Sequence, residues 1–142
     1  RIQALQHQER LIRRFEKDAN RAVSYQIVVN RGIILEVPAL GLDGMPLDGV
    51  YDTIVYAPKY DEGGALIRSV DPGNGSAAKK SSGMYARYLS RVTFSELEDR
   101  QYTYPVMQTL LEFSVPVHKA SNLKRTFSFY TRLENCRRGG GK

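Results

Sequence analysis

The spacing of apolar residues changes once along this chain, near residue 25, from a period of 3.6 to a period of 2. Before that point they recur three, four or seven positions apart, at Ile2, Leu5, Ile12, Phe15, Ala19, Ala22 and Val23. This spacing predicts one amphipathic helix over residues 1–24, with the basic residues mainly on its other faces. No capping residue precedes Ile2, so we expect the helix to continue upstream of Arg1.

After residue 25, β-branched runs and strict alternation of apolar and polar residues predict strands. The expected strands are Tyr25–Val29, Ile33–Val37, Asp52–Ala57, Leu66–Val70, a segment from about Leu89, Val106–Val117 and Arg125–Leu133. The Gly- and Asp-rich residues 39–50 predict a loop, and the Gly/Ser-rich residues 71–83 predict a flexible one.

The last two expected strands each have one apolar face, and seven residues join them, so we expect an antiparallel hairpin. That face needs a cover, and the N-terminal helix is the only long element able to provide it. The predicted class is therefore α+β, a long N-terminal amphipathic helix packed on an antiparallel β-sheet. We expect one domain over 1–142, divided into a helix (1–24), a segment of short strands (25–70), a flexible loop (71–83), a closing antiparallel sheet (84–135) and a basic disordered tail (136–142).

The composition fits a single domain of 142 residues with a net charge of +6. All of that charge comes from residues 119–142, because the first 118 residues hold equal numbers of basic and acidic side chains. The charge therefore predicts a basic end rather than a nucleic-acid-binding domain. The single cysteine, Cys136, excludes an internal disulfide. No apolar run is long enough to span a bilayer.

Motifs for catalysis are missing from the sequence. It contains no G-x-S-x-G, P-loop, H-E-x-x-H or G-x-G-x-x-G pattern. We therefore expect a protein that is not an enzyme, with no catalytic residue, cofactor or small-molecule substrate. A repeated Leu-Asp-Gly places Asp43, Asp48 and Asp52 close together in the sequence. Turn formation explains these aspartates best, and a weak calcium-type site is the alternative.

The basic side chains of the predicted helix are candidates for partner contacts. One interpretation is a solvated face with local ion pairs, Glu9 with Arg13 and Asp18 with Arg21. The other is a contact surface for neighbouring subunits. The basic residues of the tail either keep the chain soluble or attract an acidic partner. The candidate interaction residues are Leu5, Arg10, Arg13, Arg14, Lys17, Arg21, Arg137 and Arg138.

Three segments together resemble a known family. They are the helix ALQHQERLIRRFEKDANRAV, the segment YDTIVYAPKYDEGGALIRSV, and a closing set made of YLSRVTFSEL, VMQTLLEFSV and RTFSFYTRLENCRR. In this order they resemble the soluble part of type IV filament subunits, the pilins and type II secretion pseudopilins, and among them the minor pseudopilins most.

The resemblance implies a structural subunit that assembles into, or caps, a helical filament driving protein secretion. It implies contacts with other pilin or pseudopilin subunits through the N-terminal helix, and a removed upstream helix that anchors the precursor in the inner membrane. The soluble domain would then lie in the periplasm or on a periplasmic or extracellular filament. The alternative from the charge and tyrosine content is a DNA-uptake minor pilin or another basic nucleic-acid-binding module.

Overall fold

The computed structural model describes the backbone of residues 2–97, 103–118 and 121–137, and the side chains of 8–97, 103–117 and 121–137. Within these ranges one helix, α1 (Ile2–Arg21), precedes eight strands. The strands are β1 (Ser24–Val28), β2 (Gly32–Leu40), β3 (Pro46–Lys59), β4 (Ala65–Asp71), β5 (Ser81–Arg87), β6 (Leu89–Glu96), β7 (Val106–His118) and β8 (Ser121–Arg132).

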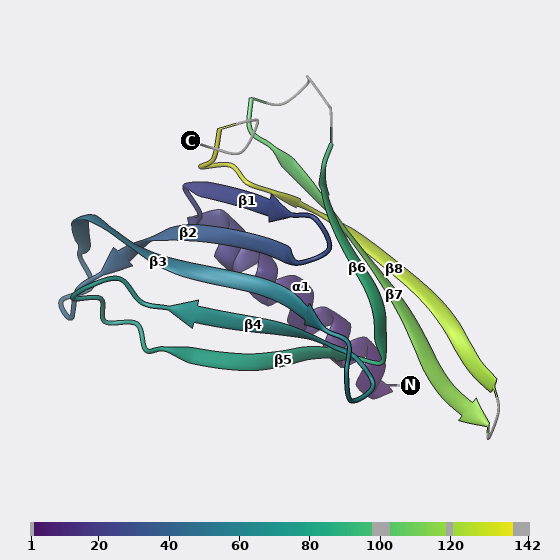
Figure 1. Ribbon diagram of the computed structural model, residues 1–142. Coiled ribbons are helices and arrows are strands. Elements are labelled where there is room, and N and C mark those ends of the chain that lie inside the picture. Colours follow the sequence, from purple (N-terminus) through teal and green to yellow (C-terminus); the bar gives the residue numbers. More distant parts are fainter. Residues whose placement is uncertain (1, 98–102, 119–120, 138–142) are drawn as a thin grey trace.

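The strands form two antiparallel sheets, each in chain order. The first five make one sheet, β1-β2-β3-β4-β5, and the last three make the other, β6-β7-β8. Figure 1 shows the second sheet crossing one end of the first, with the β7–β8 hairpin continuing past the body of the molecule. Within each sheet every strand pairs with its neighbour in sequence, and short turns join β1 to β2 and β3 to β4.

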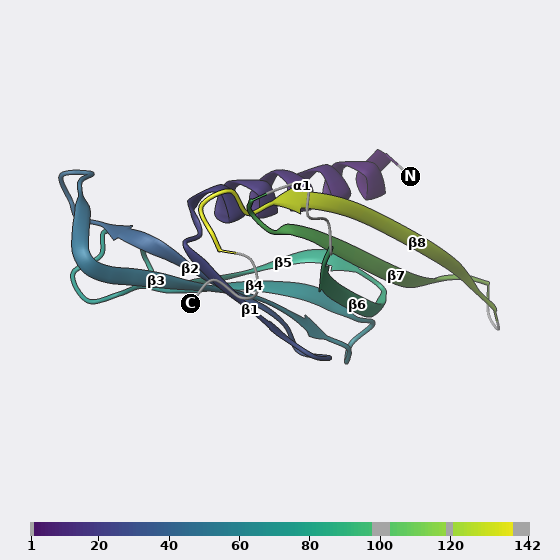
Figure 2. The ribbon, with the colours of Figure 1, turned by 90° about the horizontal axis from the view of Figure 1, so that it is seen from above.

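Helix α1 lies against both sheets. Figure 2 shows it along one face of the five-stranded sheet, with β8 beside it. The Phe15 ring, 1% exposed, is central to this contact. Its centroid is 5.0 Å from that of Tyr56 in the first sheet, and 5.9 Å from those of Phe94 and Phe129 in the second. The core is therefore one cluster to which the helix and both sheets contribute.

The predicted class, α+β with a long helix covering one antiparallel sheet, is wrong. The protein is mostly antiparallel β, and 61% of the residues described with their side chains lie in strands. The strands divide into two sheets, and the helix accounts for only 11% of the same residues. Alternation predicts that a strand has one buried face, but it carries no information on which strands share a sheet. The prediction places the apolar faces on one sheet, whereas two sheets and the helix bury them together.

Strand bounds differ most where the strands are polar. Strand β5 begins at Ser81, inside the segment 71–83 for which the sequence predicts a flexible loop. Strand β3 begins at Pro46, inside the expected loop 39–50, and β8 begins at Ser121 rather than Arg125. Exposed strand segments lack the apolar alternation by which strands are recognised, so hydrogen bonding to a neighbouring strand alone defines them.

Gly64 marks a close approach between the sheets. Its φ is +88°, and a Cβ there would lie 2.0 Å from the carbonyl oxygen of Leu89, the first residue of β6. Only glycine allows both this backbone conformation and this contact. The five-stranded sheet can thus abut the backbone of the three-stranded sheet here.

The segment after β8 returns to the end of α1. The Asn135 side chain donates to the carbonyl of Asn20 at 2.6 Å, and the Cys136 thiol donates to that of Ala22 at 3.3 Å. These bonds satisfy carbonyls that a helix end leaves without partners. Cys136, expected in the disordered tail, is instead buried, and its burial raises the pKa of the thiol to about 11.

Candidate functional site

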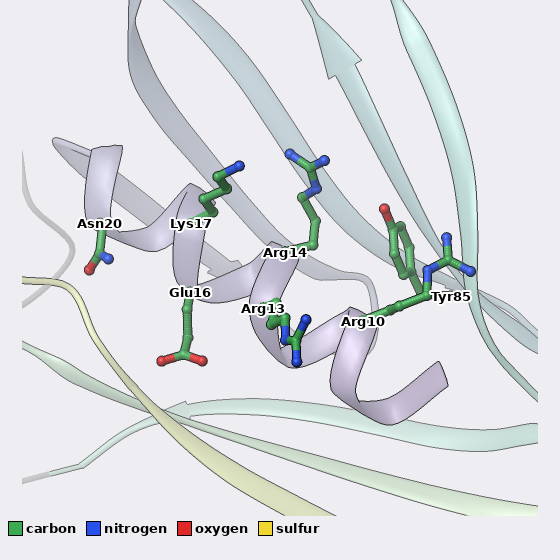
Figure 3. A pocket seen from close by; sticks show the side chains of 7 residues that line it. All are labelled: Arg10, Arg13, Arg14, Glu16, Lys17, Asn20 and Tyr85. Carbon is green, nitrogen blue, oxygen red and sulfur yellow. The ribbon is translucent and has the colours of Figure 1, made fainter. Parts of the chain in front are cut away.

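A shallow groove lies along the outer side of α1. Its volume is about 540 Å³, and its lining comes from the helix and from strand β5. Figure 3 shows the residues that line it, which are Arg10, Arg13, Arg14, Glu16, Lys17, Asn20 and Tyr85. We call this surface the basic groove.

The helical period creates this groove. Arg10, Arg13, Arg14 and Lys17 are three or four positions apart and therefore lie on neighbouring turns of one face. The opposite face carries the buried residues Leu11, Phe15 and Ala19. Since the apolar face is fixed against both sheets, the basic face is held outward.

Tyr85 forms the wall of the groove opposite the helix. The Arg10 guanidinium lies over the Tyr85 ring, 5.6 Å from its centroid, a cation–π arrangement. Figure 3 shows Arg14 and Lys17 projecting to one side of the helix and Glu16 and Asn20 to the other. Arg10 and Tyr85 also line a smaller adjoining pocket of about 60 Å³, together with Met84, Ala86 and Arg87.

The electrostatic balance of the groove is positive. Four basic side chains line it, and Glu16 is the carboxylate among the described lining residues. One of the four, Arg13, pairs with Glu9, which lies outside the lining, at 3.9 Å. This confirms the pairing expected from their spacing. Both of these side chains are exposed, 82% for Arg13 and 68% for Glu9. An exposed ion pair with this separation cancels little of the positive charge of Arg13. The groove therefore suits an anionic or acidic partner surface.

A buried polar cluster sets the position of the helix beneath the groove. Asp18 accepts two bonds from Arg68, at 2.7 and 3.0 Å, and one from the Tyr56 hydroxyl at 2.5 Å. Asp18 is 3% exposed and Tyr56 is fully buried. Burial, followed by the charge and hydrogen bond of Asp18, raises the pKa of Tyr56, so its hydroxyl remains a donor.

The predicted pairing of Asp18 with Arg21 is therefore wrong. Asp18 points inward to β3 and β4, where Arg68 supplies two parallel donors that fit a carboxylate. Arg21 instead donates to the carbonyl of Pro38 at 3.1 Å. Spacing along a helix identifies neighbours on one helix, but it cannot identify a partner 50 residues away.

The three aspartates of the candidate ion site are not brought together. Asp43 is exposed and accepts from the backbone N–H of Met45 at 3.0 Å, as a turn-forming aspartate does. Asp52 is buried and accepts from the N–H of Gly73 at 2.9 Å, while Asp48 is exposed. Within the residues that the structure describes, no group of three or more His, Cys, Asp or Glu is arranged around a common metal position.

The remaining candidate residues lie near the two ends of the chain. Arg137 is exposed just after the buried Cys136, and Arg138 lies outside the described residues. Leu5 belongs to α1, but its side chain also lies outside the described part. The sequence prediction includes four of the groove's residues and misses the contribution of Tyr85 from β5. The only signal at Tyr85 is an aromatic residue after a polar run, which by itself does not place it beside a helix.

Comparison with known proteins gives no relative. No family of known proteins matches the chain, and neither a curated protein nor a solved structure matches it. Over the described residues, α1 is too polar to count as a membrane-crossing helix.

Proposed function

We propose that the chain is a structural subunit, pilin-like or a minor pseudopilin, that assembles into or caps a helical filament of a type IV pilus or type II secretion system. The observation that carries this proposal is that the two faces of α1 have different surroundings. One face of the helix is buried against both sheets, and the other presents an exposed, basic, grooved surface. A helix held in this way is a rigid platform for packing against neighbouring subunits. The order of the three segments that resemble pilins also supports the proposal.

In this proposal the neighbouring pilin or pseudopilin subunits contact the outer face of α1. Arg10, Arg14 and Lys17 would meet acidic or carbonyl groups of those subunits, and charge matching would set their register. A helix upstream of Arg1 would anchor the precursor in the inner membrane, with the two sheets in the periplasm or on the outside of the filament. The chain would transmit force to cargo without chemistry of its own.

Cross-linking in cells tests the proposed contact. In a Cys136→Ala background, Lys17→Cys places a thiol in the groove, and Lys59→Cys places one on an exposed strand end as a matched control. We expect Lys17→Cys to cross-link to a filament subunit, identified by mass spectrometry, and Lys59→Cys to give markedly less of that product. The coding sequence upstream of Arg1 provides a second test. If it encodes no apolar stretch of about 20 residues preceded by a Gly cleavage site, the proposal fails.

Nucleic-acid binding is the second candidate, because the groove combines four basic side chains with the face of Tyr85. Fluorescence anisotropy with single- and double-stranded DNA across a salt series tests it. Binding through phosphates weakens steeply with salt, and Arg10→Gln with Arg14→Gln would reduce the slope. No binding at about 50 mM salt would exclude this candidate.

A further inference from the structure

The connection between β2 and β3 forms a projecting tip with a chemistry opposite to that of the basic groove. Residues 40–49, the acidic tip, contain Asp43 and Asp48 and no basic residue. Both aspartates are exposed. Figures 1 and 2 show this end of the five-stranded sheet far from the N-terminal end of α1.

The acidic tip also exposes large apolar side chains. Leu42 is 96% exposed and Met45 is 62% exposed, and they flank Asp43 on either side in the sequence. Apolar groups of this size on a projecting turn gain nothing from the fold of their own chain. Together with a carboxylate they have the composition of a contact surface, an apolar anchor beside a charge that orients it.

The basic groove has the complementary composition. Arg10, Arg14 and Lys17 supply positive charge, and the Tyr85 ring supplies an apolar wall. The adjoining 60 Å³ pocket adds Met84, which is 58% exposed, and its lining also includes Arg10 and Arg87. An apolar side chain next to a carboxylate would thus find apolar surface next to guanidinium groups.

We propose that the acidic tip of one copy of this chain docks into the basic groove of a second copy. Leu42 would seat against Met84 and Tyr85, and Asp43 and Asp48 would pair with Arg10 and Arg14. The contact joins two different surfaces, so the copies at the two ends of an assembly keep a free tip or a free groove. Such a contact is head-to-tail and builds open chains rather than a closed dimer. The inference goes beyond the proposed function, because it requires only copies of this chain.

Sedimentation velocity on the 142-residue chain tests the contact. We expect the average mass to rise with concentration past that of a dimer, within the range up to about 1 mM where weak contacts are populated. The rise should shrink when salt is increased from about 50 to 500 mM, because screening weakens exposed charge pairs. A chain that stays monomeric up to about 1 mM at low salt overturns the proposal.

Two neutralised variants then test which surfaces meet. Asp43→Asn with Asp48→Asn removes the charge of the tip, and the asparagine can still accept from Met45. Arg10→Gln with Arg14→Gln removes two charges of the groove. Each variant alone should associate at least about tenfold more weakly than the unmodified chain. An equal mixture of the two should recover association but stop at dimers, because only one intact tip and one intact groove remain per pair.

Matched controls separate docking from general charge effects. Asp61→Asn with Glu62→Gln neutralises two exposed acids at the β3–β4 turn, and Arg31→Gln with Lys59→Gln neutralises two exposed bases. These variants should associate like the unmodified chain, and circular dichroism should show all variants folded. If only the groove variant loses association, some other segment fills the groove. If the mixture stays monomeric, the tip and groove do not meet. Either result overturns the proposal.

Discussion

The buried carboxylate of Asp18 is a group whose removal should cost much of the protein's stability. Asp18→Ala leaves the Arg68 guanidinium, whose side chain is 15% exposed, without its buried counter-charge. It also leaves the Tyr56 hydroxyl, fully buried, without its acceptor. Breaking a buried pair from one side typically costs about 3–5 kcal/mol, because the remaining charge stays desolvated.

We therefore expect Asp18→Ala to lower the free energy of unfolding by about 3–5 kcal/mol. For a chain of this length that corresponds to a fall in Tm of roughly 12–20 °C. Tyr56→Phe should cost only about 1–2 kcal/mol, because Asp18 keeps both bonds to Arg68. Urea titration followed by far-UV circular dichroism measures each value, which suits a chain without tryptophan.

The exposed Glu9–Arg13 pair provides the matched control, and Glu9→Ala should change stability by less than about 0.5 kcal/mol. A double-mutant cycle with Arg68→Ala then isolates the pair, with an expected coupling of about 2 kcal/mol. If Asp18→Ala costs less than about 1 kcal/mol, the assignment of Asp18 as the buried anchor between helix and sheet is refuted.

Three further outcomes follow from the core and its edges. Phe15→Ala should cost about 3–5 kcal/mol in urea unfolding, because it empties the ring position that both sheets contact, and a cost near that of an exposed residue would contradict this. Gly64→Ala should lower Tm by at least about 8 °C, since the methyl group meets the Leu89 backbone at a positive φ, and an unchanged Tm would show that the sheets do not abut there. At pH 8 the folded Cys136 should react with iodoacetamide about 100-fold more slowly than in urea, because burial raises its pKa from about 9 to about 11. Equal labelling rates in the folded and unfolded chain would contradict the burial. The stabilisation linked to this thiol is complete below about pH 9 and is lost as the pH rises through about 11.

Local signals are sufficient for most elements of the fold. The change of period at residue 25 predicts α1 and β1, and strict alternation predicts β7 from Val106 almost to its end at His118. The polar edge strand β5 escapes prediction because it owes its conformation to pairing with β4 rather than to its own residues. The division of the strands into two sheets cannot be predicted for a related reason, because this division depends on which buried faces meet.

For the site, too, the sequence predicts only which residues are neighbours on one helix. The spacing of Arg10, Arg14 and Lys17 is sufficient to place them on one helix face. The wall of the groove comes from Tyr85, which is 68 positions or more away from those residues in the sequence. The spacing of Asp18 suggests a neighbour on its own helix, whereas its partner lies on β4. In each case the missing information is contact between segments distant in the sequence.

The position of Phe15 and Asp18 on the same helix has a mechanical consequence. Phe15 contacts rings from both sheets, Asp18 is bonded to β3 and β4, and the carbonyls of Asn20 and Ala22 hold the segment after β8. A force applied along α1 is therefore shared among several strands and is resisted in shear rather than by peeling one strand at a time. A pull on the helix end would load the two sheets at once, and the molecule would yield as one body.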